Sequence, residues 1–227
     1  MYIQSDIAMQ RPGLPPLQAA FQLNLKHGRM NFLVGPPGSG KSALLRILLG
    51  RQRPDRGLIA ADGRIWFHRN GEGLIETLDR PVTGAFHEDI LSRHQTVLAV
   101  LARALPDWPP QARARRVAEL LVRFGMKRLA KRRVMDLDLE QCWLLVLARA
   151  FAPRPKLLLL DEPFLNLAPE QIQRLEAELR AMVRAEGVSV LVSDAGNRPL
   201  GRPGDLILPM AMGQVLRVFP VPTSVVA

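Results

Sequence analysis

A glycine-rich segment early in the chain carries a lysine and a serine at the spacing of a phosphate-binding loop. It fits the pattern G-x-x-x-x-G-K-[S/T] at every fixed position. In such loops the backbone N–H groups surround the phosphates, the lysine reaches the β- and γ-phosphates, and the hydroxyl ligates Mg²⁺. We therefore expect a nucleoside triphosphate here, with Lys41 on its phosphates and Ser42 on Mg²⁺. The predicted nucleotide-binding residues are Gly35, Pro36, Pro37, Gly38, Ser39, Gly40, Lys41, Ser42 and Ala43.

The residues on either side of this loop predict the elements that would position it. Residues 30–34 are a short apolar run, which indicates a buried parallel strand. Residues 43–49 are rich in helix formers and stop at Gly50. Strand, glycine-rich turn and helix is the order in which a helix N-terminus faces a phosphate. A chance glycine-rich turn is the alternative, and the flanking residues favour the phosphate-binding interpretation.

Two carboxylates follow a second apolar run. Leu157–Leu160 predicts a fully buried strand, and Asp161 and Glu162 come directly after it. Ligands of open α/β sheets lie beyond the carboxyl ends of the strands, so Asp161 should arrive beside Ser42 and hold Mg²⁺. Glu162 would then face the γ-phosphate, where a carboxylate can orient or deprotonate the attacking water. We therefore expect Glu162 to be the catalytic residue.

The composition excludes several classes of protein. A chain of 227 residues with 48% hydrophobic and 23% charged residues is typical of a globular protein. It contains no run of about 18 apolar residues, which predicts that it has no membrane span, and residues 1–6 lack the pattern of a signal peptide. Cys142 is the single cysteine, which excludes an internal disulfide and a cysteine-rich metal site. We expect a cytoplasmic protein.

The net charge of +10 is unevenly spread along the chain. Between residues 111 and 133, nine basic residues stand against Glu119 alone. The segment has two interpretations: a surface for nucleic acid or anionic lipid, or an ordinary solvated helical face. The scarcity of aromatic residues weakens a single-strand-binding interpretation. The basic residues are Arg113, Arg115, Arg116, Arg123, Lys127, Arg128, Lys131, Arg132 and Arg133.

Periodicity predicts the remaining elements. Strands and turns are expected over residues 1–30, with a strand at residues 2–4, and over residues 51–81 as a small antiparallel lobe. Residues 95–151 are expected to be helical. The other predicted elements are a helix at Cys142–Phe151, an amphipathic helix at Pro169–Glu186, a buried strand at Val188–Val192 and a closing hairpin over 205–218.

Three motifs together resemble the ATP-binding cassette (ABC) ATPase family, the motor subunits of ABC transporters. They are Gly35–Ser42, Leu147–Ala150 and Leu157–Pro163. The resemblance covers essentially the whole chain and implies an α/β fold with a P-loop NTPase core of the ABC type. It implies one nucleotide-binding domain over residues 1–227. The core and an antiparallel β-lobe would comprise residues 1–86 and 152–227, with an inserted helical subdomain at 87–151.

The same resemblance implies cofactors and partners. It implies ATP and Mg²⁺, and a dimer in which each site joins one subunit's phosphate loop to the other's signature sequence. The dimer would form with a second, regular ABC subunit or with another copy of this chain. An integral membrane transporter subunit would hold it at the inner face of the membrane. Nucleic acid is disfavoured as a partner, and an anionic membrane surface stays open as a contact for residues 111–133.

The chain departs from the family at the signature, normally Leu-Ser-Gly-Gly-Gln, which falls on residues 137–141. The serine and both glycines are replaced by Asp138, Leu139 and Glu140. Two like charges about 4 Å apart repel by about 4 kcal/mol at an effective dielectric constant near 20, so the two acids oppose a triphosphate. Leu139 would also block close approach of the backbone. We expect this half-site to bind ATP poorly.

Four further family positions differ. The glutamine that begins the helical subdomain is His87, the switch histidine is Asp194, and the aspartate closing the loop after the Asp-Glu-Pro strand is Ala168. No adenine-stacking aromatic is evident near Arg11, and Tyr2 is the candidate substitute. Three hypotheses follow: a divergent transporter ATPase subunit with slow or partner-dependent hydrolysis, a non-hydrolysing ATP-binding regulatory or assembly protein, and, more weakly, a soluble ABC protein acting on nucleic acid.

Overall fold

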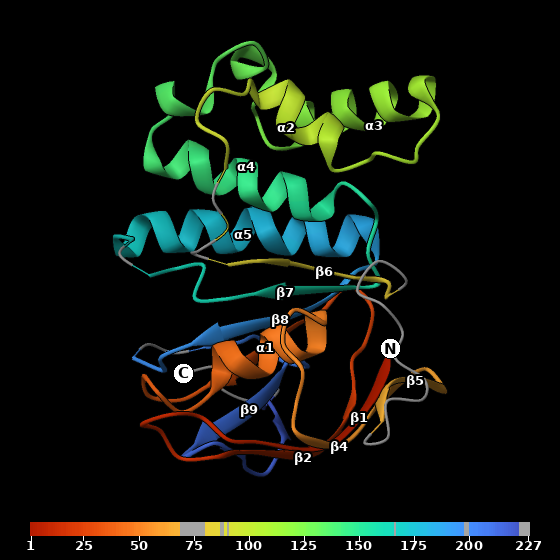
Figure 1. The fold of residues 1–227 in the computed structure, drawn as a ribbon. Coiled ribbons are helices and arrows are strands. Elements are labelled where there is room, and N and C mark those ends of the chain that lie inside the picture. Colours follow the sequence, from red (N-terminus) through yellow and green to blue (C-terminus); the bar gives the residue numbers. More distant parts are fainter. Residues whose placement is uncertain (69–79, 87–88, 90, 166, 198–199, 223–227) are drawn as a thin grey trace. The chain divides into compact units, whose positions relative to one another are not determined.

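The computed structural model describes most of the chain, namely residues 1–68, 80–86, 89, 91–165, 167–197 and 200–222 (Figure 1). Contacts within it divide the chain into two compact units. The first comprises Met1–Gly84 with Lys156–Ala227, and the second is Ala85–Pro155. The subdomain limits predicted from the sequence remain a proposal. No helix in the described ranges is long and apolar enough to cross a membrane.

A mixed sheet forms the framework of the first unit. Within the described residues its strands follow the order β5-β4-β1-β2-β10-β9-β3-β8-β7-β6, and β11 pairs with β9. Antiparallel pairing at one end of this order gives way to parallel pairing at the other. The strands are β1 Tyr2–Met9, β2 Leu17–Asn24, β3 Met30–Val34, β4 Arg56–Ala61, β5 Arg64–His68, β6 Val82–Ala85, β7 Leu157–Leu160, β8 Ser189–Asp194, β9 Leu206–Ala211, β10 Gln214–Val215 and β11 Phe219–Pro220.

The antiparallel part is built from strands with alternating burial. β1 pairs with β2 and β4, and β4 pairs with β5. Every second side chain of β1 is buried from Ile3 to Met9, which is the period of a sheet with one covered face. The strand is therefore longer than the segment 2–4 predicted from the sequence, because the alternation continues through Ser5 and Ile7.

The parallel part brings the ends of three strands together. β3 pairs with β8 so that Val34 lies opposite Asp194, and β7 pairs with β8 so that Leu160 lies opposite Val192. All four residues of β7 are buried, which explains its unbroken leucine run. The residues that follow β3 and β7, and the last residues of β8, consequently meet at one sheet edge. The described residues of this unit include the helices α1 (Lys41–Leu49) and α5 (Pro169–Glu186).

The second unit is helical within its described residues, except for the end of β6. It contains α2 (Val97–Arg103), α3 (Pro110–Arg123) and α4 (Leu139–Phe151), with short 3₁₀ turns at Lys127–Leu129 and Val134–Asp136. The sequence predicted a start for α4 at Cys142, which is wrong by one turn. The helix begins earlier because Asp138 caps it: its Oδ1 accepts from the backbone N–H of Gln141 at 2.8 Å.

One member of the basic segment is an internal structural residue. Arg116 is only 2% exposed, and its guanidinium donates to the carbonyls of Phe151 at 2.7 Å and Ala152 at 3.1 Å, at the end of α4. It also pairs with Glu119 at 3.1 Å. Burial alone would raise the pKa of the Glu119 carboxyl, but the hydrogen bond from Arg116 and the nearby arginine charges lower it. The interpretation of all nine basic residues as surface charges is therefore wrong for Arg116.

Replacing Arg116 with alanine should lower the free energy of unfolding by about 3 kcal/mol, because two buried carbonyls lose their donor and the side-chain packing is lost. Chemical denaturation followed by circular dichroism measures this. Arg115→Ala is the matched control, since Arg115 is exposed on the same helix. Equal stability of the two variants would contradict a structural role for Arg116.

Candidate nucleotide-binding site

The phosphate loop runs from the end of β3 into the first turn of α1, as the sequence predicted. Gly38 and Gly40 have φ angles of 78° and 108°, a left-handed region that glycine adopts without strain. A side chain at Gly35 would collide with the carbonyl of Met210, so this position also requires glycine. The first N–H groups of α1 have no partner within the helix, and together with its dipole they favour an anion.

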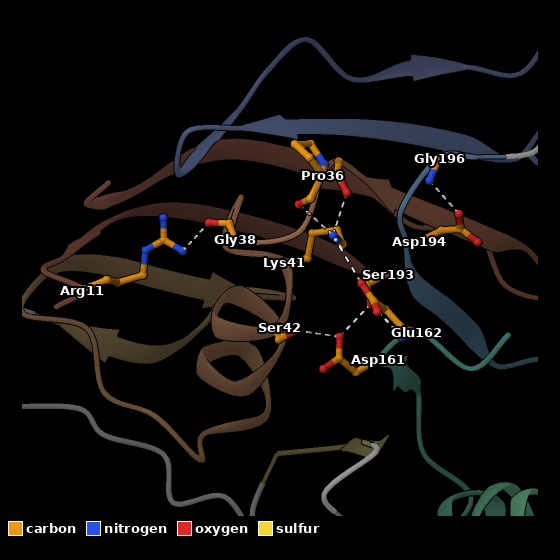
Figure 2. A network of polar contacts seen from close by, with 11 residues as sticks. Arg11, Pro36, Gly38, Lys41, Ser42, Asp161, Glu162, Ser193, Asp194 and Gly196 are labelled. Carbon is orange, nitrogen blue, oxygen red and sulfur yellow. Dashed lines mark hydrogen bonds and ion pairs between the residues drawn. The ribbon is translucent and has the colours of Figure 1, made fainter. Parts of the chain in front are cut away.

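Lys41 is the buried cation of this loop. It is 4% exposed, and its Nζ donates to the carbonyls of Gly35 at 2.6 Å and Pro36 at 3.1 Å (Figure 2). The same Nζ lies 3.4 Å from Oε1 of Glu162. The backbone therefore fixes the ammonium inside the loop. A phosphate entering the loop would compete with Glu162 for it.

Asp161 is held by two hydroxyls, one from the first turn of α1 and one from the end of β8. Its Oδ1 accepts from Ser42 Oγ at 2.9 Å and from Ser193 Oγ at 2.7 Å (Figure 2). Ser193 Oγ in turn accepts from the backbone N–H of Glu162 at 2.8 Å. The structure thus brings together Ser42 and Asp161, which the sequence placed at one site. Sequence reasoning missed Ser193, although the parallel pairing of β7 and β8 would have placed it beside Asp161.

The oxygen donors at this point suit Mg²⁺. A serine hydroxyl and a carboxylate are hard ligands, and Mg²⁺ is usually held by one or two protein oxygens together with phosphate oxygens and water. Among the described residues, no group of three or more His, Cys, Asp or Glu side chains could hold a metal by itself. Ser42 and Asp161 therefore fit a metal that arrives with a phosphorylated ligand.

Two carboxylates, Glu162 and Asp194, line one cavity close to the phosphate loop. Glu162 has a φ of 48°, and with Asp194 it lines a cavity of about 280 Å³. Oδ1 of Asp194 accepts from the N–H of Gly196 at 2.8 Å, which turns the chain at the end of β8 (Figure 2). Asp194 is 9% exposed and cannot supply the positive charge or the donor that a histidine would offer.

Arg11, rather than Tyr2, contacts the phosphate loop from the N-terminal part of the chain. Arg11 donates to the carbonyls of Gly38 at 3.1 Å and Pro15 at 2.8 Å, and burial lowers its pKa. Tyr2 stands at the far end of β1, about 23 Å along the strand from Met9, which is near Arg11. The suggestion that Tyr2 replaces the adenine-stacking aromatic is therefore wrong.

The remaining departures from the family pattern are placed as follows. The Asp138 carboxylate accepts a hydrogen bond from the N–H of Gln141, a donor that the helix N-terminus would otherwise offer to an anion. The next residue, Leu139, is 62% exposed. Ala168 precedes α5 and offers no side-chain acceptor to the helix, and its N–H donates to Oε1 of Gln171 at 2.9 Å. His87 lies outside the described residues.

Comparison with known proteins gives consistent matches. A family model described as "ABC transporter" matches residues 19–165. The Fe(3+) ions import ATP-binding protein FbpC of Pseudomonas fluorescens is 35% identical over 185 residues, which are 81% of this chain and 49% of FbpC. The lipoprotein-releasing system ATP-binding protein LolD of Maricaulis maris is 34% identical over 210 residues, 91% of this chain and 90% of LolD. The chain spans about half the length of FbpC and of two further import ATP-binding proteins.

A solved structure supports the fold. The ATP-binding cassette MJ0796, a dimer bound to ADP and Pi, matches with a TM-score of 0.77 at 22% identity and covers 97% of this chain and 98% of its own. At this level of identity the likeness concerns the fold alone. It confirms the predicted fold class, an α/β P-loop NTPase of the ABC type.

Proposed function

This chain belongs to the ABC transporter family of ATP-binding proteins, and we propose that it is a divergent ATP-binding subunit of a transporter-type complex. It binds ATP in its own phosphate loop and couples that binding to an integral membrane partner. Its hydrolysis is slow or depends on a second ABC subunit. Family members bind ATP, and relatives such as FbpC and LolD carry import or release functions in their names.

The observation that carries this proposal is the pair of hydrogen bonds around Asp161. Ser42 from the loop and Ser193 from β8 both donate to one carboxylate oxygen, at 2.9 and 2.7 Å. The proposed oxygen ligands of the metal, Ser42 and Asp161, are thus within hydrogen-bond distance of each other, close to the ammonium of Lys41. Bound Mg²⁺ would neutralise charge on the phosphates. Gly35–Ala43 would cradle the phosphates, with Lys41 as the fixed positive charge.

Glu162 is proposed as the residue that positions and deprotonates the attacking water. In the structure its carboxylate is engaged with Lys41 at 3.4 Å. An incoming phosphate competes for Lys41, and the Glu162 carboxylate can then accept a hydrogen bond from water. Asp194 places a second negative charge at the same hollow, which opposes the developing charge of the phosphoryl group. This acid is one reason to expect slow turnover.

The signature position supports an asymmetric partnership. Asp138 and Glu140 put two carboxylates at the N-terminus of α4, and Asp138 already occupies the N–H of Gln141. In a homodimer both composite sites would face these acids. In a heterodimer with a regular ABC subunit, one site would join Lys41, Asp161 and Glu162 to an intact signature. We therefore propose a heterodimer as the hydrolysing form.

Purified alone, this chain should turn over ATP well below about 1 s⁻¹, the low end of ordinary enzyme rates. A coupled assay across a range of protein concentrations measures this, because dimer formation would raise the specific activity. Glu162→Gln is the control for residual activity from contaminants. A faster rate that disappears in Glu162→Gln would show that the homodimer suffices, and would contradict the argument from the signature.

The non-hydrolysing regulatory or assembly protein is the second candidate. It is favoured by one specific observation, the presence of carboxylates at both Asp138 and Asp194, where the family uses a serine and a histidine. Both candidates bind ATP through Lys41, so binding does not separate them. Turnover in a dimer with an intact partner signature does.

A further inference from the structure

A basic hollow lies in the first unit, at the sheet edge opposite the phosphate loop. It has a volume of about 460 Å³, within the range of small-molecule sites. Its lining includes the turn that leads into β3, the last two turns of α5 and Gly187 just before β8. The phosphate loop instead follows the end of β3. The hollow is therefore distinct from the proposed nucleotide site.

Cationic side chains reach this hollow from three segments that are far apart in the sequence. Among the residues that the structure describes, the lining includes four arginines and one histidine, and neither a carboxylate nor an aromatic ring of Phe, Tyr or Trp. His27 and Arg29 come from the β2–β3 turn, Arg180 and Arg184 from α5, and Arg202 from the segment before β9. Like charges brought together by the fold repel one another, and a bound anion would relieve that repulsion.

Three of these arginines are held in place: Arg29 and Arg184 each through one nitrogen, and Arg180 through its whole guanidinium. Arg29 Nη1 donates to the carbonyl of Pro203 at 3.0 Å, and Arg184 Nε donates to the carbonyl of Arg180 at 3.4 Å. Arg180 is 6% exposed and forms ion pairs with Glu176 at 2.9 Å and Asp205 at 2.8 Å. A guanidinium carries five N–H donors, so Arg29 and Arg184 keep further N–H groups for a ligand.

The charge of the hollow is only partly balanced by its surroundings. Of its four arginines only Arg180 has acidic partners; within the described ranges Arg29, Arg184 and Arg202 form no ion pair. The carbonyls at the end of α5 offset part of this charge, although some of them already accept hydrogen bonds. The carbonyl of Gly187 lies 2.8 Å from His27 Nδ1, and that of Val183 accepts from the N–H of Val188 at 3.1 Å.

We propose that this hollow binds a compact soluble phosphate anion, of the size of pyrophosphate or tripolyphosphate. Guanidinium groups bind phosphate oxygens through paired N–H donors, which makes arginine the preferred residue for such ligands. The described part of the lining offers no aromatic ring of Phe, Tyr or Trp on which a nucleotide base could stack, so the polyphosphate itself supplies the recognition. A lipid headgroup shares this chemistry, and the test separates the two sources.

The test is calorimetric titration of pyrophosphate at about 150 mM salt into the full chain carrying Lys41→Ala, which disables the phosphate loop. One binding event is expected to remain. Adding Arg184→Gln and Arg202→Gln to this variant should weaken that event at least tenfold. Adding Arg64→Gln should leave it unchanged, because Arg64 is an exposed arginine of β5 that does not line the hollow. Titrating wild type saturated with ATP gives the same comparison without the Lys41 substitution.

Two further readouts complete the test. The Arg184→Gln and Arg202→Gln pair should not lower the Tm, since these side chains form no ion pair with the described residues, whereas pyrophosphate should raise the Tm of the unsubstituted hollow by mass action. Equal weakening by Arg64→Gln, or no binding in the Lys41→Ala chain and in ATP-saturated wild type, would overturn the proposal. Sedimentation with phosphatidylglycerol vesicles without any pyrophosphate binding would also overturn it, in favour of a lipid surface.

Discussion

Replacing Lys41 with alanine should weaken ATP binding at least a hundredfold, which corresponds to about 2.7 kcal/mol. The ammonium is 4% exposed and lies inside the loop, where it would meet the phosphates in a setting with little water to screen the charge. Isothermal titration of Mg·ATP into both proteins measures the change. Lys26→Ala is the matched control, because Lys26 is an exposed lysine of the same unit.

The same substitution removes two hydrogen bonds to the loop backbone, so loss of binding has to be separated from loss of folding. The carbonyls of Gly35 and Pro36 would lose their contacts with Nζ. Lys41→Arg keeps a positive charge near them and should keep the Tm within a few degrees, yet it should still bind ATP poorly, because a guanidinium does not fit the geometry of an ammonium. Equal ATP affinity in wild type and Lys41→Ala would refute the phosphate-loop assignment.

The sequence was sufficient to predict the proposed nucleotide site because its parts lie next to regular elements. The run before Gly35 is a strand and the run after Ser42 is a helix, and both follow from local pattern. The meeting of Ser42 with Asp161 needed only one general rule, that parallel strands end at a common edge. Local pattern and topology both predicted that Ser42 and Asp161 meet, and in the structure Ser42 Oγ lies 2.9 Å from Asp161 Oδ1.

The features that the sequence did not predict depend on pairing and burial over long range. From the sequence, Arg116 is predicted to be one more surface charge. Only the packing of its helix against the end of α4 shows that it is buried. Ser193 gains its role only through the register of β8 on β7. Tyr2 was a plausible base-stacking residue while the length of β1 was unknown. None of these contacts leaves a periodic signal, because each joins segments at least 30 residues apart or depends on where a strand ends.

A mixture of two chains, each slow or inactive alone, should hydrolyse ATP at least ten times faster than the sum of their separate rates. The first is wild type, with an intact phosphate loop and an acidic signature. The second carries Lys41→Ala together with Asp138→Ser, Leu139→Gly and Glu140→Gly, so that it offers a regular signature but no working loop. Serine at 138 can still cap α4, while each of the two glycines in its first turn costs about 1 kcal/mol, so circular dichroism must verify that this chain folds.

The gain is expected because only the mixed dimer joins Glu162 of wild type to a signature free of negative charge. Mixing wild type with a Lys41→Ala chain that keeps Asp138 and Glu140 is the matched control, and it should stay inactive. If the restored mixture is also inactive, the experiment is repeated with Asp194→His in the first chain. Activity at that point would assign the block to Asp194, where a second carboxylate faces the hollow beside Glu162. Inactivity in both mixtures, with ATP binding intact, would reject the hydrolysing heterodimer and leave the chain as an ATP-binding regulator.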